Sequence, residues 1–586
     1  MDGSNILPQR LVLPGHRQDF APATRLLNRW PAVATEWLLA ALCLSPLLLL
    51  PLARDQGHFA YAGQVILDGG LPYRDVFDQK GPATHFTFAL ALALFGQTAW
   101  GVRCFFFLAA LLTTRLAASV GQRLAGLTAR LPCALAMALA LVQGDEGTAW
   151  HSGQVEDLLL TLQLAAVCLF GNERAVDSRW RTALAGGLLG LACTYKPTAM
   201  LPSIALLIVA GACLPRAAHT ARFSYCSWLA CSVGGFILPP LMALGYLAVR
   251  GAFDDFWMVV VDFNSAYAEL KNGLVKGVGM LVTRWGRLTV LASWGALAVR
   301  ARSARTTDRL LWGLAGANLA MIVWQGKYWP YHWTPLIGCL AIFAGVSAAQ
   351  VAGELRGRLG RCSAAAIPAM VALLLAAVPV DLKYLSGMWR GTMRVVAGRQ
   401  ALDDFRSRFE CGAVGADVHR QAAEYIRSRT SPGDTMLVWG YETVVNFLAD
   451  RRAPTRFAVD RILCLDGFKR QAAWRTEFLN SLGQSPPAYI VVVDHNGTSM
   501  WRESTEELRR FHEFHDLVSR DYVEETRFDR LRLFRRSVAT GSAKERAVTQ
   551  MRPAQPAARA GATDAQRNPA TGAGNPADLI AGEATW

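Results

Sequence analysis

The sequence predicts a mainly α-helical membrane protein, a polytopic transmembrane helical bundle of about 11 spans followed by a small C-terminal α/β extramembrane domain. Composition is the first observation, because 52% of the 586 residues are hydrophobic and 18% are charged, against about 25% charged in a typical soluble domain. The second is a set of uncharged apolar runs, such as residues 37–53 and 223–249, which are long enough to cross about 30 Å of hydrocarbon. The third is an alternation of strand and helix patterns after residue 399. These observations exclude a soluble enzyme of any class.

Charge-poor runs mark the expected spans in order along the chain. They lie near residues 36–53, 83–119, 131–144, 158–172, 182–195, 197–215, 223–249, 277–299, 310–325, 333–350 and 362–380. The run at 83–119 is long enough for one or two elements, and a second crossing there would invert all later loops. Charge parity favours one crossing plus a partial or re-entrant element.

Arginine-rich loops orient the bundle. Residues 174–181, 300–309 and 356–361 carry such loops, and the positive-inside rule places them in the cytoplasm. The N-terminus is then cytoplasmic, and everything after residue 381 is external. Most of the net charge of +15 is accounted for by these loops, so no nucleic-acid partner is needed. The predicted location is a bacterial inner membrane, with the C-terminal domain in the periplasm.

The chain divides into four parts. Residues 1–35 form a cytoplasmic segment, and residues 36–382 form the transmembrane module, with a first external loop at 54–82. Residues 399–536 form the periplasmic α/β domain, and residues 537–586, rich in Ala, Gly, Pro and Thr, form a disordered tail. The expected helices of the α/β domain are 417–430, 468–482 and 501–518, and its expected strands are 435–439, 489–493, 522–528 and 531–534.

The 12 cysteines do not form a metal-binding pattern. No CxxC or Cys/His ligand spacing occurs, so a structural zinc site has no sequence support. Cys411 and Cys464 lie in the polar C-terminal region. Two alternatives stay open for them, a disulfide or two unpaired structural thiols.

The first external loop carries the most informative charged residues. Asp55 lies where the chain leaves the first span, a partly desolvated position that suits a carboxylate to accepting a proton. Lys80 comes just before the next apolar run, where an ammonium meets phosphate at headgroup depth. The alternative interpretation is that an acid or lysine beside a span is only a topological anchor.

Several segments resemble the GT-C superfamily of membrane glycosyltransferases, particularly bacterial relatives of dolichyl-phosphate-mannose–protein mannosyltransferases and lipid A aminoarabinose transferase. The resemblance rests on Asp55 and on the segments 70–75 (GLPYRD), 80–82 (KGP) and 326–332 (GKYWPYH), and it covers roughly residues 36–350. It implies a polyprenyl-phosphate-linked sugar donor and transfer at the external face. It also implies that Asp55 is the catalytic base for inverting attack by an acceptor. The family often has a second acid directly after the first, where this chain has Gln56.

A departing polyprenyl phosphate develops negative charge and calls for cations near the outer headgroup plane. The candidate donor-phosphate ligands are Lys80, Lys196, Lys327, His332 and Arg284. Snorkelling of such side chains to the interface is the competing interpretation. The candidate sugar- or acceptor-binding residues are Tyr61, Tyr73, Arg74, Asp75, Glu156 and Asp157. For the last two, an electrostatic role at a helix N-terminus is equally compatible with the pattern.

The predicted function is therefore that of an integral membrane glycosyltransferase, hexosyl or pentosyl. It moves a sugar from a polyprenyl-phosphate donor to a hydroxyl or amine of a lipid, glycan or protein acceptor. No cofactor is assigned, and a divalent metal ion is left open because no ligand spacing supports it. The alternative is a multispan transporter or flippase of a lipid-linked or anionic substrate, but the chain shows neither related halves nor charges at mid-membrane depth.

Overall fold

The computed structural model describes residues 30–142, 153–171, 178–213, 225–302, 306–359, 364–378, 382–495 and 501–537. These residues all belong to one compact unit, which ends at Ser537. The expected cytoplasmic segment up to residue 29 and the expected disordered tail from residue 538 lie outside the described residues.

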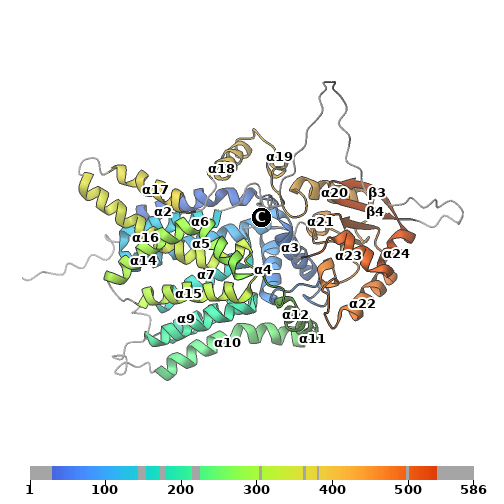
Figure 1. The fold of residues 1–586 in the computed structure, drawn as a ribbon, viewed down its shortest axis with the longest axis horizontal. Helices are drawn as coiled ribbons and strands as arrows, with labels where there is room; N and C mark the ends of the chain where they lie inside the picture. The colour runs from blue at the N-terminus through green and yellow to red at the C-terminus, as the bar shows by residue number, and fades with distance from the viewer. Residues whose placement is uncertain are drawn as a thin grey trace, which may run out of the picture. The chain divides into compact units, whose positions relative to one another are not determined.

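The first part of the chain is helical throughout (Figure 1). Its first helices are α2 (Trp30–Leu44), α3 (Arg54–Leu67), α4 (Pro82–Phe95), α5 (Ala99–Ala125), α6 (Arg130–Val142), α7 (Val155–Phe170), α8 (Arg179–Tyr195) and α9 (Met200–Ala212). Those that follow are α10 (Tyr225–Val249), α11 (Phe253–Phe256), α12 (Asn264–Ala268), α13 (Leu274–Thr283), α14 (Gly286–Arg302), α15 (Thr306–Gln325), α16 (Thr334–Leu359), α17 (Ala366–Ala377) and α18 (Leu382–Val396).

By length and composition, three helices of the described residues can cross a membrane: Ala99–Ala125, Tyr225–Val249 and Pro330–Arg358. The number rises to five if each of two bent pairs counts as one span. One pair joins Val33–Leu49 to Arg54–Leu67 with a bend of 80°. Several expected spans are instead short apolar helices of 10–17 residues, since prolines and glycines interrupt the apolar runs. Within 83–119 only α5 has the length of a span, and α4 is shorter.

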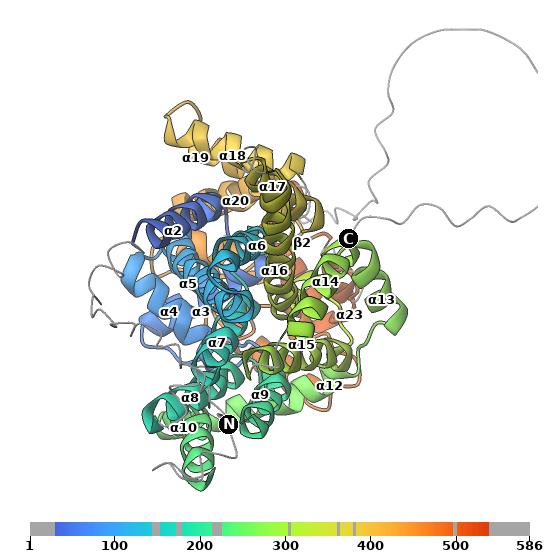
Figure 2. The same ribbon diagram turned by 90° about the vertical axis from the view of Figure 1, so that its left-hand side faces the viewer.

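Close helix packing builds the core of the bundle. Helix α16 packs against both α6 and α14, and Figure 2 shows these helices side by side. Helices α8 and α10 approach through glycine, because a methyl group at Gly186 or Gly190 would overlap the carbonyl oxygens of Ser232 and Phe236. A small residue thus allows the two backbones to meet.

The C-terminal region forms a four-stranded mixed sheet with helices on both faces, which confirms the predicted α/β fold. The strand order is β1-β2-β4-β3, with β1 (Met436–Trp439) parallel to β2 (Tyr489–Val493). Strands β3 (Tyr522–Phe528) and β4 (Leu531–Arg536) form an antiparallel hairpin, and β4 pairs with β2. The surrounding helices are α19 (Leu402–Arg406), α20 (Ala416–Arg429), α21 (Val444–Ala449), α22 (Gln471–Gln484), α23 (Ser504–Arg510) and α24 (His512–Asp521).

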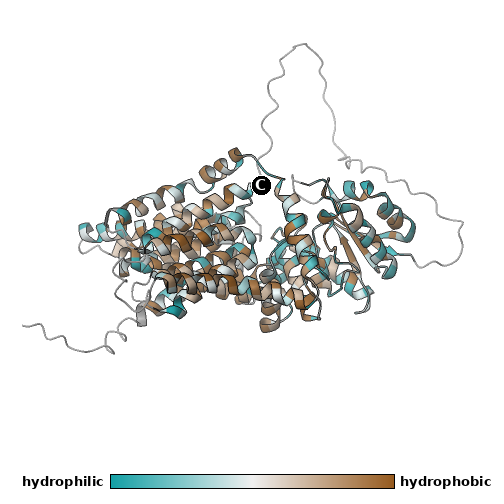
Figure 3. Cartoon of the chain, turned by 90° about the horizontal axis from the view of Figure 1, so that it is seen from below, coloured by the Kyte–Doolittle hydropathy of each residue, from teal (hydrophilic) through white to brown (hydrophobic). Residues whose placement is uncertain are grey.

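The sheet is buried on both faces, as the continuous apolar runs of β1 and β2 require. One face shares a hydrophobic core with α3 of the helical module, through Phe59 and Val65. Gly57 of α3 permits this approach, because a methyl group there would overlap the side chain of Val444 in α21. Figure 3 shows the contrast in composition, with mostly hydrophobic helices on the left and more hydrophilic helices around the sheet on the right.

Cys411 and Cys464 are both buried and unpaired. Of the two alternatives for these residues, the structure therefore has two unpaired thiols and not a disulfide.

Candidate active site

A cavity of about 230 Å³ lies where the first loop, the α8–α9 turn, the α12 region and the segment before α16 meet. It brings together four of the five predicted phosphate ligands, which come from three separate parts of the sequence. Its lining residues are Gln79, Lys80, Lys196, Pro197, Thr198, Val260, Asn264, Tyr267, Ala268, Lys271, Trp324, Gln325, Lys327, Trp329, Tyr331 and His332. The cavity therefore carries a strong excess of positive charge.

The backbone of Lys80 is held from both sides. Its N–H donates to the Asp78 carboxylate over 2.7 Å, and the Tyr73 hydroxyl donates to its carbonyl over 2.8 Å. Gly81 follows, and its N–H donates to the carbonyl of Tyr195 over 2.9 Å. A methyl group at Gly81 would overlap the carbonyl of Thr194, so this position needs glycine. These contacts fix where the Lys80 side chain enters the cavity.

The Lys80 ammonium remains charged and makes no direct ion pair with any side chain in the described ranges. Burial lowers its pKa, but the negative charges of Glu156, Asp55 and Asp78 outweigh burial, so the pKa is raised. The nitrogen lies 5.8 Å from the centre of the Tyr331 ring. The ammonium is thus a suitable contact for an anion.

Asp78 belongs to a buried cluster that sequence reasoning missed. Its second carboxylate oxygen lies 3.2 Å from Nε2 of His58 and 3.5 Å from Nε2 of His85. Burial raises the pKa of Asp78, but the two nearby histidines outweigh burial and hold the pKa well below its usual range. Asp78 is therefore an ionised acceptor that keeps Lys80 in place.

Glu156 pairs with one cation of the cavity and lies near a histidine. The Lys196 ammonium donates to its Oε1 over 2.6 Å, and Nε2 of His332 lies 3.8 Å from the same atom. Nδ1 of His332 is buried, and none of the residues that the structure describes gives it a hydrogen-bond partner. A phosphate oxygen in the cavity would meet that need.

Lys327 lines the cavity but its ammonium is already engaged. It donates to the carbonyl of Tyr267 over 2.8 Å and to the carbonyl of Leu270, and it lies 3.9 Å from the Tyr267 ring centre. Burial, together with the nearby charge of Lys271, lowers the pKa of Lys327 to about 8. Lys327 thus holds the end of α12, which places Tyr267 at the cavity.

Asp55 lies in the first turn of α3, beside the cavity but not among its lining residues. Its Oδ2 accepts a hydrogen bond from the Gln154 amide over 3.2 Å. Its charge acts on Lys80 and on Tyr331, both of which line the cavity. The carboxylate is therefore close enough to the cationic cavity to act electrostatically on two of its lining residues.

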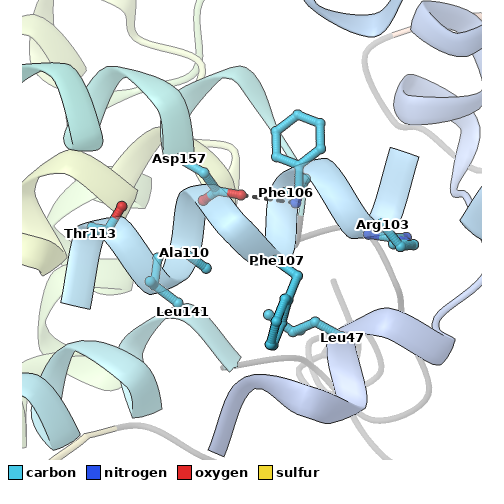
Figure 4. A pocket seen from close by; sticks show the side chains of 9 residues that line it. Leu47, Arg103, Phe106, Phe107, Ala110, Thr113, Leu141 and Asp157 are labelled. Atoms are coloured by element: carbon cyan, nitrogen blue, oxygen red, sulfur yellow. Dashed lines mark hydrogen bonds between the residues drawn. The ribbon is translucent and has the colours of Figure 1, made fainter. Parts of the chain in front are cut away.

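Asp157 takes the helix N-terminus role that the sequence left open. Its Oδ2 accepts hydrogen bonds from the backbone N–H groups of Gly153 over 2.8 Å and Gln154 over 3.1 Å. Asp157 also lines a second, mostly apolar pocket with Phe106 and Arg103. Figure 4 shows this pocket, with the hydrogen bond between Gly153 and Asp157 as a dashed line. Asp157 thus orients Gln154, which in turn contacts Asp55.

The other predicted residues are not brought to the cavity. Tyr61 accepts a hydrogen bond from the backbone N–H of Ala453 over 2.8 Å, and Tyr73 supports Lys80. Arg74 and Asp75 form an exposed pair 2.9 Å apart. Arg284 lies with its guanidinium 5.4 Å from the ring centre of Trp285. Local sequence patterns could not separate these structural roles from ligand binding, since both use the same residue types.

The described residues contain no group of three or more His, Cys, Asp or Glu arranged to hold a metal ion. The divalent metal that the sequence left open therefore gains no ligand set from these ranges.

The fold and the site define a polytopic membrane protein with a cationic cavity beside a carboxylate. Residues 79–238 match the family model of dolichyl-phosphate-mannose-protein mannosyltransferases. The fold matches that of ArnT from Cupriavidus metallidurans without ligand, with a TM-score of 0.54 at 15% identity. It also matches the same protein bound to undecaprenyl phosphate, with a TM-score of 0.52 at 14% identity. Each match covers 88% of this chain and 98% of the other.

No curated protein matches this chain significantly in sequence. The family match and the shared fold nevertheless confirm the resemblance seen in the sequence. Residues 79–238 are thus similar to the dolichyl-phosphate-mannose-protein mannosyltransferase family, and the fold of the chain is similar to that of ArnT.

Proposed function

We propose that the chain transfers a hexosyl or pentosyl group from a polyprenyl-phosphate donor to an acceptor hydroxyl or amine, with inversion and with Asp55 as general base. The observation that carries this proposal is the adjacency of Asp55 to a cavity lined by Lys80, Lys196 and His332. A base and a phosphate site side by side are what displacement of a phosphate from a sugar requires.

The cavity supports the phosphate end of the reaction. It is lined by four lysines and one histidine, whereas Glu156 is the acid that pairs with them. Lys80 is the best placed to meet the phosphate, because its ammonium has no competing ion pair in the described part of the chain. A matched structure of similar fold is bound to undecaprenyl phosphate, which is consistent with this assignment.

The proposed step is a single displacement. The Asp55 carboxylate takes the proton of the acceptor, and the acceptor oxygen or nitrogen forms a bond to the anomeric carbon. The bond between that carbon and the phosphate oxygen breaks, and the electron pair leaves with the polyprenyl phosphate. Lys80 and His332 stabilise the charge that develops on this leaving group.

The predicted orientation of the chain in the membrane supports an active site at the external face. On the predicted topology the arginine-rich loops face the cytoplasm, and the loops that carry Asp55 and Lys80 face the periplasm. We therefore place the reaction at the periplasmic face of a bacterial inner membrane, with a lipid, glycan or protein as acceptor.

The test uses the purified full-length protein in vesicles loaded with polyprenyl-phosphate-linked, radiolabelled sugar, with a membrane extract as the source of acceptor. Label should move to a new acceptor, and Asp55→Asn should lower the rate by at least about 100-fold because the base is lost. Asp68→Asn, at an exposed acid paired with Arg452, is the matched control and should keep wild-type activity. Retained transfer in Asp55→Asn, or label that only crosses the bilayer as in a flippase, would overturn the proposal.

A further inference from the structure

One loop of the C-terminal domain reaches the carboxylate of Asp55. It leaves β1 at Trp439 and continues through Gly440 to Tyr441 and Glu442. Gly440 has a φ of +145°, and a methyl group there would overlap the side chain of Val493. Glycine is therefore required for the chain to turn away from the parallel pair β1–β2 toward α3.

Glu442 anchors this loop to the residue beside Asp55. Its carboxylate accepts hydrogen bonds from the Ala413 backbone N–H over 2.6 Å and from Nε2 of His419 over 2.8 Å. It also lies 3.6 Å from the guanidinium of Arg54. Burial raises the pKa of Glu442, but Arg54 and His419 outweigh burial and hold the pKa below its usual value. Two consecutive residues of the loop thus meet two consecutive residues of α3, Glu442 with Arg54 and Tyr441 with Asp55.

The ring of Tyr441 is held by its neighbours. The Arg54 guanidinium lies 5.9 Å from its centre and that of Arg461 lies 4.8 Å away, while His58 packs edge-on at 5.9 Å. These contacts hold the phenol beside the first turn of α3, within reach of the Asp55 side chain. Burial raises the pKa of Tyr441 well above its usual value, and the negative charges of Asp55 and Asp78 add to this effect. The phenol therefore stays protonated and is able to donate a hydrogen bond to this carboxylate.

We propose that Tyr441 is a positioning residue for Asp55, through which the C-terminal domain completes the active site. Its O–H donates to the carboxylate from one side, while the Gln154 amide donates from the other over 3.2 Å. Two donors aim the carboxylate and favour its ionised, basic form. This inference rests on the proposed function of Asp55 as a base.

Other charged and titratable groups surround Asp55, and they stay unchanged in the test. They are Arg54 and His58 on α3, Asp78 and Lys80 in the first loop, Glu156 on α7, Tyr267, Tyr331, and Arg461 of the C-terminal domain.

The test compares Tyr441→Phe with Tyr522→Phe in the full-length protein. Tyr522 is the matched control, because its hydroxyl donates to the carbonyl of Pro487 over 3.0 Å inside the same domain. With the radiolabelled donor assay, Tyr441→Phe should lower kcat about tenfold and leave the donor KM within about twofold. The acid limb of the pH profile should move to higher pH, because a carboxylate base that loses a hydrogen-bond donor holds its proton more tightly. Tyr522→Phe should leave the limb in place, and a superimposable profile in Tyr441→Phe would overturn the inference.

Two further measurements keep the proposal testable whatever the stability of Tyr441→Phe. Incorporation of 3-fluorotyrosine at position 441 retains the ring and strengthens the donor, so the acid limb should move to lower pH; a limb that does not move contradicts the role. In an Asp55→Asn background, Tyr441→Phe should cause no further loss of residual turnover. An equal further loss would mean that the hydroxyl acts elsewhere. Activity retained by Asp55→Asn alone would instead remove the proposed base, which is a separate failure.

Discussion

Two clusters of charged side chains lie near Asp55, and they are built differently. The anchor cluster, Arg54, Glu442 and His419, joins α3 to the C-terminal domain, and its carboxylate meets an arginine, a histidine and a backbone N–H. The cavity cluster, Lys80, Lys196, Lys327, His332 and Glu156, has more cations than acids. Balanced charges hold a structure together, whereas an excess of one sign is suited to a ligand of the opposite sign.

The lysines of the cavity cluster also differ from one another in how far their ammonium groups are already paired. Lys327 donates to two backbone carbonyls, and Lys196 is paired with Glu156. The hydrogen bonds that the described residues make to Lys80 involve its backbone, so its ammonium is available to a ligand. A charge that already has a protein partner contributes less to ligand binding. We therefore expect a larger effect on sugar transfer at Lys80 than at Lys327.

The largest effect is expected at Lys80. Lys80→Met removes the available ammonium while the backbone contacts with Asp78 and Tyr73 remain, so we expect kcat for sugar transfer to fall by about 100-fold. The melting temperature should change little. The measurement is donor turnover together with thermal unfolding in detergent. Activity within about threefold of wild type would mean that Lys80 has a structural role. The proposed difference between Lys80 and the already paired lysines would then be wrong.

The next effect is on stability rather than on the chemical step. Glu442→Gln leaves Arg54 buried without its counter-ion, and breaking such a pair costs about 3 kcal/mol. Since the folded-state pKa of Glu442 lies below its ordinary value of 4.5, its contribution is present above that value and is lost as the pH falls. The variant should therefore unfold earlier at neutral pH and lose part of the acid dependence of wild-type unfolding. A variant as stable as wild type would contradict the structural role of the anchor cluster.

The smallest effect is expected at Lys327. Lys327→Met removes hydrogen bonds to two carbonyls at the end of α12, so we expect a loss of about 1 kcal/mol in stability and less than about tenfold in turnover. The pKa of this lysine is lowered to about 8, so its positive charge is lost as the pH rises through that value. The variant should accordingly lose the part of the wild-type pH dependence near pH 8 that Lys327 contributes, while Lys196, whose pKa is also lowered to about 8, keeps its own part. A loss as large as that of Lys80→Met would show that Lys327 binds the phosphate directly.

Local pattern predicts some of the residues that the candidate site brings together. Asp55 and Lys80 were predicted because each lies at the end of an apolar run, and chain position relative to a span is a local property. The same reasoning also selected Arg74 and Asp75, which form an exposed pair. It missed Asp78, His58 and Tyr441, whose roles depend on contacts between segments as far apart as α3 and the C-terminal domain.

By itself, the sequence determined the class of protein and its main elements. Apolar runs and their basic flanks are local signals of a membrane bundle, and the strands 489–493 and 522–528 follow from local alternation and β-branched residues. Only the tertiary structure decided which cations share a cavity, which acids are already paired, and that a loop of the C-terminal domain contacts Asp55. The physical reason is that the role of a charge depends on its neighbours in space, and those neighbours come from segments hundreds of residues apart, as with His58 and Thr443.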